Sequence, residues 1–494
     1  MSSIFSFFRR RSKRAILLLV MVSLLGLLSW SILVAAEEDA AGGVETRPAV
    51  AALQSTYTVC MPAMMRNYPP PPPIFGVVMP VIDNGNGLAQ AVQAGVYWAN
   101  HSAFSWAGIE PSRTEPPTYN WGTVDEQSLI NATPNGLVVI ARVHLTPPWA
   151  RELPSHNCSR IKRDSLDEFA QFLTVLVNRY KEAPYNVKYW ELDSEVDVDP
   201  ALTDPANPVG FWCWGDSQDS YFGGGYFAEM LQWAYPAIKA ADPQAQVVIG
   251  GLLLDCDPRN PPSGKTCQSS RFLEGVLRGG GGPYFDVVSF HAYAYYGGAL
   301  GQMGNPNWTG GVWKQSTAVL EKASFVHQVL SGYGYGSKGI MNMEAALFCE
   351  DDPPPSSDCL QTQAMYVPRA YAEAMASGVM AQAWFWMKDP VWRSTGLLDA
   401  LLNPKPVYYA YQFASRELSH ARYVGPVSDY APGVTGYSFV SDTQRIQVVW
   451  SADNSSHSIW PSSGFVRALD KYGASIGGPP VSVGVSPVYL EFTP

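Results

Sequence analysis

Two glutamates are the strongest candidates for chemistry in this sequence of 494 residues. Glu195 ends the run that starts at Trp190, and Glu344 ends the run that starts at Gly339. The predicted strands are 187–193, which Glu195 follows by two residues, and 339–344, which Glu344 ends, so each glutamate is expected at a strand end. Two carboxylates at one site can divide the work of breaking an acetal bond. One protonates the leaving oxygen as an acid, and the other faces the anomeric carbon as an anion.

Nearby acidic residues compete for these roles. Glu191, Asp193 and Glu195 alternate with Leu192 and Ser194 along the predicted strand, and the period of two places all three acids on one face. A slip of the register would exchange their roles. A carboxylate taken alone is more often a solvated surface group, so the hypothesis depends on the pair and not on either residue.

Polar and aromatic side chains are frequent at the other predicted strand ends. Such residues suit a cleft in which rings stack on a ligand and polar groups orient it. The predicted binding residues are Asn100, Trp106, His144, Trp149, Ser194, His291, Tyr293, Trp384 and Trp386.

Short apolar runs alternate with helical periodicity between residues 74 and 418, and they predict one α/β domain. The expected strands are 75–82, 96–104, 137–145, 187–193, 247–254, 287–293, 339–344 and 380–386. The helix candidates are 165–182, 226–240, 271–278, 312–330, 361–376 and 406–417. Eight such units favour a closed parallel (β/α)8 TIM barrel, whose active site forms at the C-terminal strand ends. A doubly wound open sheet is the alternative.

The pattern changes at the C-terminus, where residues 419–494 are predicted to form a small antiparallel β-sandwich. Short alternating runs at 436–440, 445–450, 464–469 and 488–492 are separated by residues that favour turns. Packing against the barrel is the expected role of this domain. Exposed rings such as that of Trp460 leave carbohydrate binding open as an alternative.

The order of these motifs resembles clan A of the glycoside hydrolases, and most closely families 39 and 5, from about Ile74 to Leu418. In that clan a strand-4 Asn-Glu supplies the acid/base and a strand-7 Glu the nucleophile. The resemblance assigns these roles to Glu195 and Glu344. It also matches His291 and Tyr293 to a strand-6 His and Tyr, the Tyr bonding the nucleophile. Trp386 or Trp384 becomes the platform beneath the sugar ring. The implied function is retaining hydrolysis of an O-glycosidic bond in an oligo- or polysaccharide, without a cofactor.

The sequence departs from the pattern of the clan at several positions. Ser194 replaces the Asn that donates to the sugar 2-hydroxyl, and Val196 replaces a Pro. The clan commonly has an Arg at the end of strand 2 that supports the nucleophile, and the nearest candidate here is the uncharged Asn100. An exported, non-catalytic carbohydrate-binding barrel is therefore the alternative function.

The N-terminus is predicted to direct export to the cell surface or beyond. Five basic residues between Arg9 and Arg14 precede an apolar run from Ala15 to about Ala36, which is typical of a signal peptide or of an uncleaved membrane anchor. Residues 37–73 form a linker that ends in five prolines. Export favours disulfides, and proximity along the chain suggests the pairs Cys158/Cys213, Cys256/Cys267 and Cys349/Cys359, with Cys60 left over.

Composition and charge narrow the possible partners. The chain is 47% hydrophobic and carries 16 Trp, 26 Tyr and 20 Phe, which is enough to bury a large core and to line a cleft with rings. Its net charge of −10 repels phosphate backbones, so nucleic acid is not expected as a partner. The seven histidines form no ligand pattern, and no metal is predicted. The expected ligand is a neutral carbohydrate.

Overall fold

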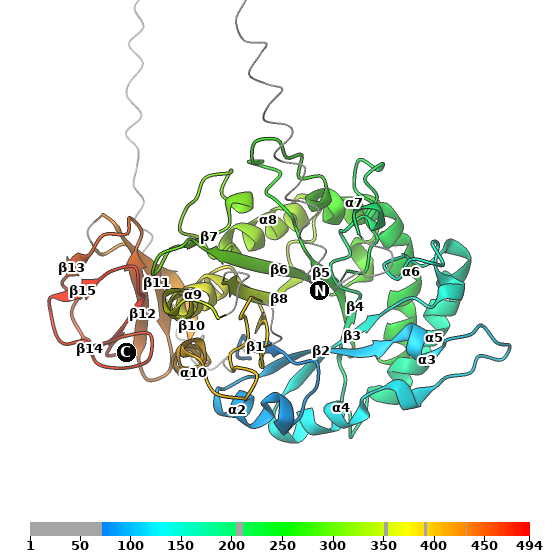
Figure 1. The fold of residues 1–494 in the computed structure, drawn as a ribbon, viewed down its shortest axis with the longest axis horizontal. Helices are drawn as coiled ribbons and strands as arrows, with labels where there is room; N and C mark the ends of the chain where they lie inside the picture. The colour runs from blue at the N-terminus through cyan, green and yellow to red at the C-terminus, as the bar shows by residue number, and fades with distance from the viewer. Residues whose placement is uncertain (1–71, 204–210, 350–353, 390–392, 431) are drawn as a thin grey trace, which may run out of the picture. The chain divides into compact units, whose positions relative to one another are not determined.

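The structure is a computed structural model that describes residues 72–494, apart from 204–210, 350–353, 390–392 and 431 (Figure 1). The predicted leader (residues 1–36) and almost all of the predicted linker (residues 37–73) lie outside this part of the chain. Within the described residues no helix combines the length and apolar character needed to cross a bilayer.

Eight parallel strands close into a barrel (Figure 1), so the predicted fold class is confirmed. Their order is β5, β4, β3, β2, β1, β9, β8, β6, and pairing of β5 with β6 closes the ring. The strands are β1 (Phe75–Val78), β2 (Trp98–Ser105), β3 (Val138–His144), β4 (Tyr189–Leu192), β5 (Gln246–Leu252), β6 (Val287–Tyr296), β8 (Gly339–Phe348) and β9 (Gln382–Trp384). The two-residue β7 (Met303–Gly304) pairs antiparallel with the end of β6.

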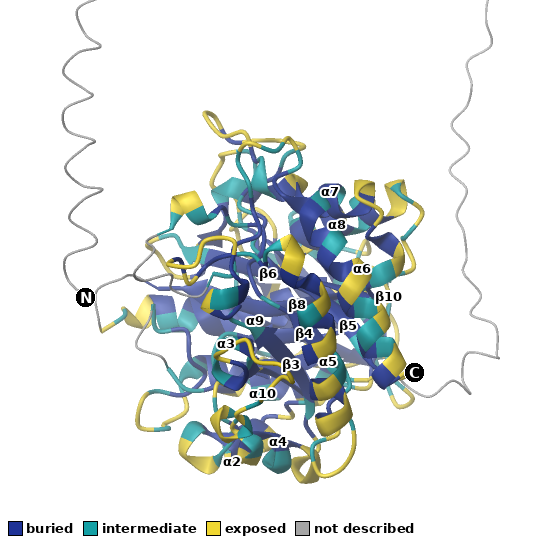
Figure 2. Cartoon of the chain, turned by 90° about the vertical axis from the view of Figure 1, so that its right-hand side faces the viewer, coloured by how far each residue is buried: buried dark blue, intermediate teal, exposed yellow. Residues whose placement is uncertain are grey.

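Helices surround the strands, and Figure 2 shows dark blue strands behind helices whose outer faces are exposed. The helices are α2 (Leu88–Gln93), α3 (Trp106–Ile109), α4 (Glu126–Ala132), α5 (Leu166–Tyr180), α6 (Gly224–Ala241), α7 (Phe272–Arg278), α8 (Val319–Gly332), α9 (Ser357–Ala376) and α10 (Pro406–Leu418). All six predicted helices are present. Only α8 starts markedly later than predicted, because Ala318 adopts a left-handed conformation and the hydroxyl of Thr317 accepts the N–H of Val319.

Aromatic packing joins β1 to the last two barrel helices. The ring of Phe75 stacks on Tyr371 of α9 at 4.4 Å and meets Tyr411 of α10 edge-on at 5.5 Å. The hydroxyl of Tyr411 donates to the carbonyl of Gly76 at 3.1 Å. These contacts fasten the first strand to the helices that follow the last one, so that sequence-distant ends of the barrel share one core.

The C-terminal residues form a separate antiparallel sheet domain. One sheet has the order β10 (Arg422–Pro426), β11 (Val434–Val440), β12 (Arg445–Ser451), β16 (Val488–Phe492), β14 (Phe465–Leu469), and the second pairs β13 (His457–Ile459) with β15 (Val481–Val483). Alternation along β12 sends Val449 into the core between the two sheets, and Val448 and Trp450 into the cluster that includes the barrel. Both faces of this strand are therefore buried.

Three disulfides link Cys158 to Cys213, Cys256 to Cys267 and Cys349 to Cys359, as predicted from the sequence. The first joins residues 55 positions apart, and the other two close short loops. Cys60 lies outside the described residues.

Replacement of Phe75 by Ala should destabilise the barrel, because Phe75 is fully buried between two rings. We expect the free energy of unfolding to fall by about 3–5 kcal/mol, as is usual for removal of a buried aromatic ring. Denaturant unfolding followed by far-UV circular dichroism measures the change. The matched control is Val92→Ala at an exposed position of α2, which should stay close to the wild type. Equal stabilities of the two variants would contradict this role of Phe75.

Candidate active site

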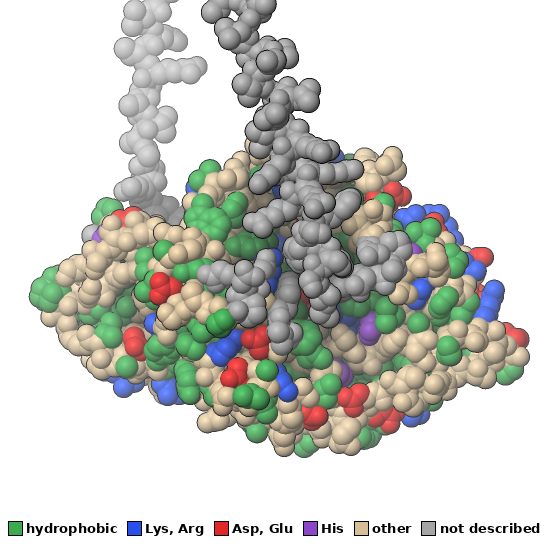
Figure 3. Space-filling model, viewed as in Figure 1, with side chains coloured by type: hydrophobic (Ala, Val, Ile, Leu, Met, Phe, Trp, Pro, Cys, Tyr) green, Lys and Arg blue, Asp and Glu red, His purple; other side chains and the backbone are tan. Residues whose placement is uncertain are grey.

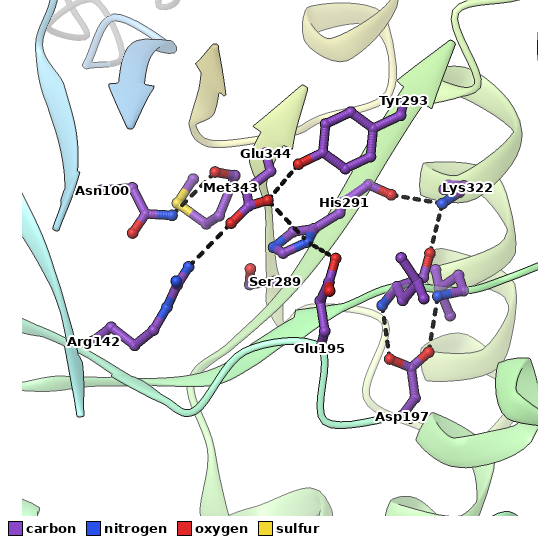
Figure 4. A network of polar contacts seen from close by, with 12 residues as sticks. Asn100, Arg142, Glu195, Asp197, Ser289, His291, Tyr293, Lys322, Met343 and Glu344 are labelled. Atoms are coloured by element: carbon purple, nitrogen blue, oxygen red, sulfur yellow. Dashed lines mark hydrogen bonds and ion pairs between the residues drawn. The ribbon is translucent and has the colours of Figure 1, made fainter. Parts of the chain in front are cut away.

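Glu195 and Glu344 meet at the C-terminal end of the barrel strands. Glu344 lies on β8, and Glu195 follows β4 by three residues. Carboxylate oxygens of the two residues lie within 4.8 Å of each other and of Nδ1 of His291 on β6. Both residues are buried, and each side chain is 11% exposed. Two acids from distant parts of the chain thus face one gap (Figure 4).

The backbone leaves the extended conformation immediately after β4. Asp193 and Glu195 have φ values of 60° and 49°, in the left-handed region. The period of two therefore does not continue to Glu195, and the expectation that Glu191, Asp193 and Glu195 share one face is wrong. Asp193 instead accepts a hydrogen bond from Nε1 of Trp214 at 2.8 Å, and Glu191 is fully buried. Of the three acids, Glu195 is the one that reaches the carboxylate of Glu344.

Three donors surround the carboxylate of Glu344. The hydroxyl of Tyr293 donates to Oε2, and Nδ1 of His291 lies 3.5 Å from the same oxygen. Nη2 of Arg142 on β3 lies 3.5 Å from Oε1. Nδ1 of His291 is also 2.9 Å from Oε1 of Glu195, so this one nitrogen lies between the two carboxylates.

Glycine in β5 makes room for the histidine ring. A side-chain carbon at Gly251 would lie 2.0 Å from Nε2 of His291. No larger residue fits at this position while the ring keeps its place between the two acids.

Arg142 was missed in the sequence, and it corrects the expectation about Asn100. Its Nε donates to Oε2 of Glu191 at 2.9 Å, and Ser289 donates to the other oxygen of Glu191 at 3.0 Å. Asn100 carries no charge and donates to the carbonyl of Met343 at 3.0 Å, beside Glu344 in β8. The positive charge next to Glu344 therefore comes from strand β3 and not from strand β2. A signal existed: Arg142 is a charged residue within the apolar run 138–143.

A buried lysine lies on the other side of the pair. Nζ of Lys322 in α8 donates to the carbonyls of His291 and Leu253, each at 2.7 Å (Figure 4). Asp197 accepts hydrogen bonds from the backbone N–H groups of Leu253 and Leu254 at 2.7 and 2.8 Å. These contacts tie the segment after Glu195 to the ends of β5 and β6.

Burial dominates the ionisation of the two acids. It raises the pKa of Glu195 to about 7, although the charges of Arg142 and Lys322 act to lower it. Burial also raises the pKa of Glu344, against the effects of His291, Arg142 and the Tyr293 hydroxyl. Burial lowers the pKa of His291, so its ring is neutral near pH 7. The site thus favours one proton shared over two carboxylates, with Arg142 and Tyr293 placed to hold Glu344 as the anion.

The structure divides the other predicted binding residues into two groups. His144, Trp149 and Trp386 are partly exposed, and Ser194 precedes Glu195 in the same turn. Trp106, Trp384, Asn100 and Ser194 have at most 1% exposure. The burial of these four side chains contradicts the prediction that they contact a ligand. The ring of Trp106 packs against Phe169 and Phe172, and Nε1 of Trp384 donates to the carbonyl of Thr395. The eight strands were correctly located, but the ends of β1, β6 and β8 differ from the prediction by three or four residues, and the inward direction of Trp106 and Trp384 was not predicted.

The spacing of Glu195, His291 and Glu344 is also compatible with three ligands of a metal ion. Arg142 already places a cation beside Glu344, which disfavours a second one. The expectation that the protein binds no metal stays a prediction.

No protein-family model and no curated protein sequence matches this chain, but many solved structures share its fold. A family 39 glycoside hydrolase from the gut symbiont Bacteroides cellulosilyticus WH2 aligns with a TM-score of 0.63 and 17% identity, over 85% of this chain and 81% of its own. A GH30 endoxylanase from Clostridium papyrosolvens C71 aligns with a TM-score of 0.55 and 14% identity, over 86% and 98%. A GH39 β-xylosidase from Caulobacter crescentus aligns with a TM-score of 0.53 and 15% identity, over 86% and 98%. These neighbours are glycoside hydrolases, and the likeness at such identities establishes the fold.

Glu195→Gln should change how stability depends on pH. The pKa of Glu195 is about 7 in the folded protein and 4.5 ordinarily, so between these values the folded state holds a proton that the unfolded state has released. Wild-type stability therefore falls as pH rises from about 4.5 to about 7, and this loss is absent in the neutral variant. The melting temperature of Glu195→Gln relative to wild type should rise across this range and level off above it. A difference that is constant with pH would contradict the raised pKa. Glu229→Gln, at an exposed position, is the control.

Proposed function

We propose that this protein is a retaining glycoside hydrolase that cleaves an O-glycosidic bond of an oligo- or polysaccharide. The observation that supports it most directly is the approach of carboxylate oxygens of Glu195 and Glu344 to within 4.8 Å. Retaining enzymes hold their carboxyl groups about 5–5.5 Å apart, whereas inverting enzymes leave about 6.5–9.5 Å for a water molecule. The shorter separation favours a covalent intermediate.

In the proposed reaction Glu344 attacks the anomeric carbon while Glu195 gives its proton to the leaving oxygen. The bond to the leaving group breaks, and a glycosyl ester of Glu344 forms. Glu195, now ionised, takes a proton from water, whose oxygen attacks the same carbon and releases Glu344. A pKa near 7 suits both halves of this cycle, since Glu195 must lose and regain one proton.

Arg142 and Tyr293 have defined tasks in this scheme. The guanidinium opposes protonation of Glu344 through its charge, and the phenol donates to the oxygen that does not need to attack. Burial raises the pKa of Tyr293 well above its usual value, so the phenol keeps its proton. Both groups therefore stabilise the anion without themselves changing state.

An exported, non-catalytic carbohydrate-binding barrel is the second candidate. It is favoured by Ser194, which stands where the similar enzymes have Asn and which has a shorter reach to a sugar hydroxyl. Loss of such a contact in the transition state costs rate more than binding.

Location outside the cytoplasm forms part of the proposal. Three disulfides favour an oxidising compartment, and the basic-apolar N-terminus supports export. On the face that Figure 3 shows, Lys and Arg side chains lie among Asp and Glu rather than in one basic patch. A neutral carbohydrate is the partner that this surface suits.

Substitution of each acid should separate the two roles. With 4-nitrophenyl glycosides, Glu344→Gln should lose turnover to background, because no other residue replaces the nucleophile. Glu195→Gln should slow cleavage by about 10²–10⁴-fold when the leaving alcohol is a sugar, and less for nitrophenolate, which needs no acid. Asp193→Asn, at a partly exposed neighbour that accepts from Trp214, serves as the matched control. Sugar binding without turnover by the wild type would instead support the second candidate.

Removal of Arg142 should move the pH profile. Its charge acts to lower the pKa values of both Glu195 and Glu344, so Arg142→Met should raise both. The acidic and alkaline limbs of kcat/KM are then expected at higher pH. Arg142→Lys keeps the positive charge, so its limbs should lie closer to those of the wild type. Arg163→Met, on the surface, should leave both limbs in place. A profile that loses height but does not move would contradict the electrostatic role.

A further inference from the structure

A short segment beside the carboxylate pair has no role in the proposed reaction so far. Residues 211–215, called the strap here, lie along the turn that carries Glu195. Trp212 N donates to the carbonyl of Ser194 at 3.1 Å, and Trp214 N donates to that of Val196 at 2.9 Å. Gly215 N donates to the carbonyl of Val198 at 2.9 Å. These bonds hold the strap in register with residues 194–198.

The disulfide between Cys213 and Cys158 fixes the strap on a second side. Cys158 belongs to the loop after β3, and both cysteines are fully buried. The strap is thereby attached to the segments that follow two neighbouring strands, β3 and β4. A side chain between these attachments has little freedom to move.

Trp212 is that side chain, and its ring lies beside the candidate site. Its centroid is 5.3 Å from that of His144, and the rings meet nearly edge-on at 84°. The guanidinium carbon of Arg142 is 5.6 Å from the same indole ring. Since Arg142 also contacts Glu344, only one residue separates the indole from the carboxylate pair.

The two rings present complementary polar atoms. Nε1 of Trp212 and Nδ1 of His144 are buried and have no hydrogen-bond partner among the described residues. Burial lowers the pKa of His144 to about 3, so the ring is neutral and one of its two nitrogens is an acceptor. The indole N–H only donates. A hydroxyl group both donates and accepts, and it would satisfy both atoms at once.

We infer that Trp212 and His144 form a hydroxyl-binding subsite for the sugar ring next to Glu195 and Glu344. The inference rests on the proposed function for the identity of the ligand as a carbohydrate. Buried polar atoms without partners are uncommon in folded proteins, and these two belong to neighbouring rings, one of which lies beside Arg142. The strap and its disulfide hold the indole in place before substrate arrives.

Two variants separate the hydrogen bond from the ring. Trp212→Phe keeps an aromatic face but lacks the N–H, and should lower kcat/KM by about 10-fold, the usual effect of one hydrogen bond. Trp212→Ala removes both and should lower it further. The probe is whichever 4-nitrophenyl glycoside the wild type cleaves, together with its monodeoxy derivatives. Removal of one particular hydroxyl from the substrate should lower the kcat/KM of the wild type by about 10-fold and leave the kcat/KM of Trp212→Phe almost unchanged.

The control is Trp233→Ala, at a half-exposed position of α6. It should match the wild type on every substrate. Equal sensitivity of wild type and Trp212→Phe to every deoxy position would overturn the subsite, even if hydrolysis itself is confirmed. The double variant Cys158→Ser/Cys213→Ser tests the strap: it should raise KM with the parent glycoside while thermal unfolding shows that the barrel remains folded.

A binding measurement keeps the subsite independent of turnover. If no glycoside is cleaved, calorimetric titration with free xylose and glucose compares the wild type with Trp212→Ala. Binding that is lost in the variant supports the subsite although the proposed hydrolysis fails. Equal binding by both proteins, or binding by neither, overturns the subsite.

Discussion

The barrel mouth is organised around the burial of more negative charge than positive. Glu191, Glu195, Asp197 and Glu344 are buried near the C-terminal ends of the strands, and Asp193 beside them is partly exposed. An isolated charge in such surroundings is strongly disfavoured, so each acid must find a donor or keep its proton. The arrangement of the surrounding residues follows from this requirement.

The buried acids meet the requirement in different ways. Glu191 takes Nε of Arg142 and the hydroxyl of Ser289, and Asp197 takes two backbone N–H groups. Glu344 accepts a hydrogen bond from the hydroxyl of Tyr293 and forms an ion pair with Nη2 of Arg142. Among the described residues, the neutral His291 is the one side chain within hydrogen-bond distance of the Glu195 carboxyl group, and burial raises the pKa of Glu195 to about 7. Glu195 and Glu344 thus differ in the hydrogen-bond donors and cations that surround their carboxyl groups.

The sequence predicted the parts of this site that depend on local pattern. Eight short runs predicted the barrel and located β4 and β8, although Glu195 lies three residues beyond β4 and Glu344 lies four residues before the end of β8. Three cysteine pairs followed from proximity along the chain. The strands β10, β13 and β15 were missed because each is short and has few apolar residues, so its pattern resembles that of a loop.

Features that depend on backbone conformation or on distant contacts were not predictable in this way. Left-handed φ values at Asp193 and Glu195 break the alternation that a strand would have, and nothing in the residue types announces them. The inward or outward direction of Trp106, Trp384 and Trp386 depends on what packs against each ring. For Trp106 it is α5, for Trp384 the Tyr366 ring of α9.

Arg142 is also a feature that depends on distant contacts. The pattern of the clan places the supporting arginine at the end of strand 2, whereas here it lies on β3. Neighbouring parallel strands place their inward side chains at similar heights, so a cation on β3 can serve an acid that a cation on β2 would otherwise serve. Pairing of Arg142 with Glu191 in the register of β3 and β4 holds the guanidinium at the right height, and its length spans the remaining distance to β8. In this structure the positive charge beside Glu344 is therefore supplied from β3. A departure from a sequence pattern is therefore weak evidence for loss of function until the neighbouring strands have been searched for the same charge.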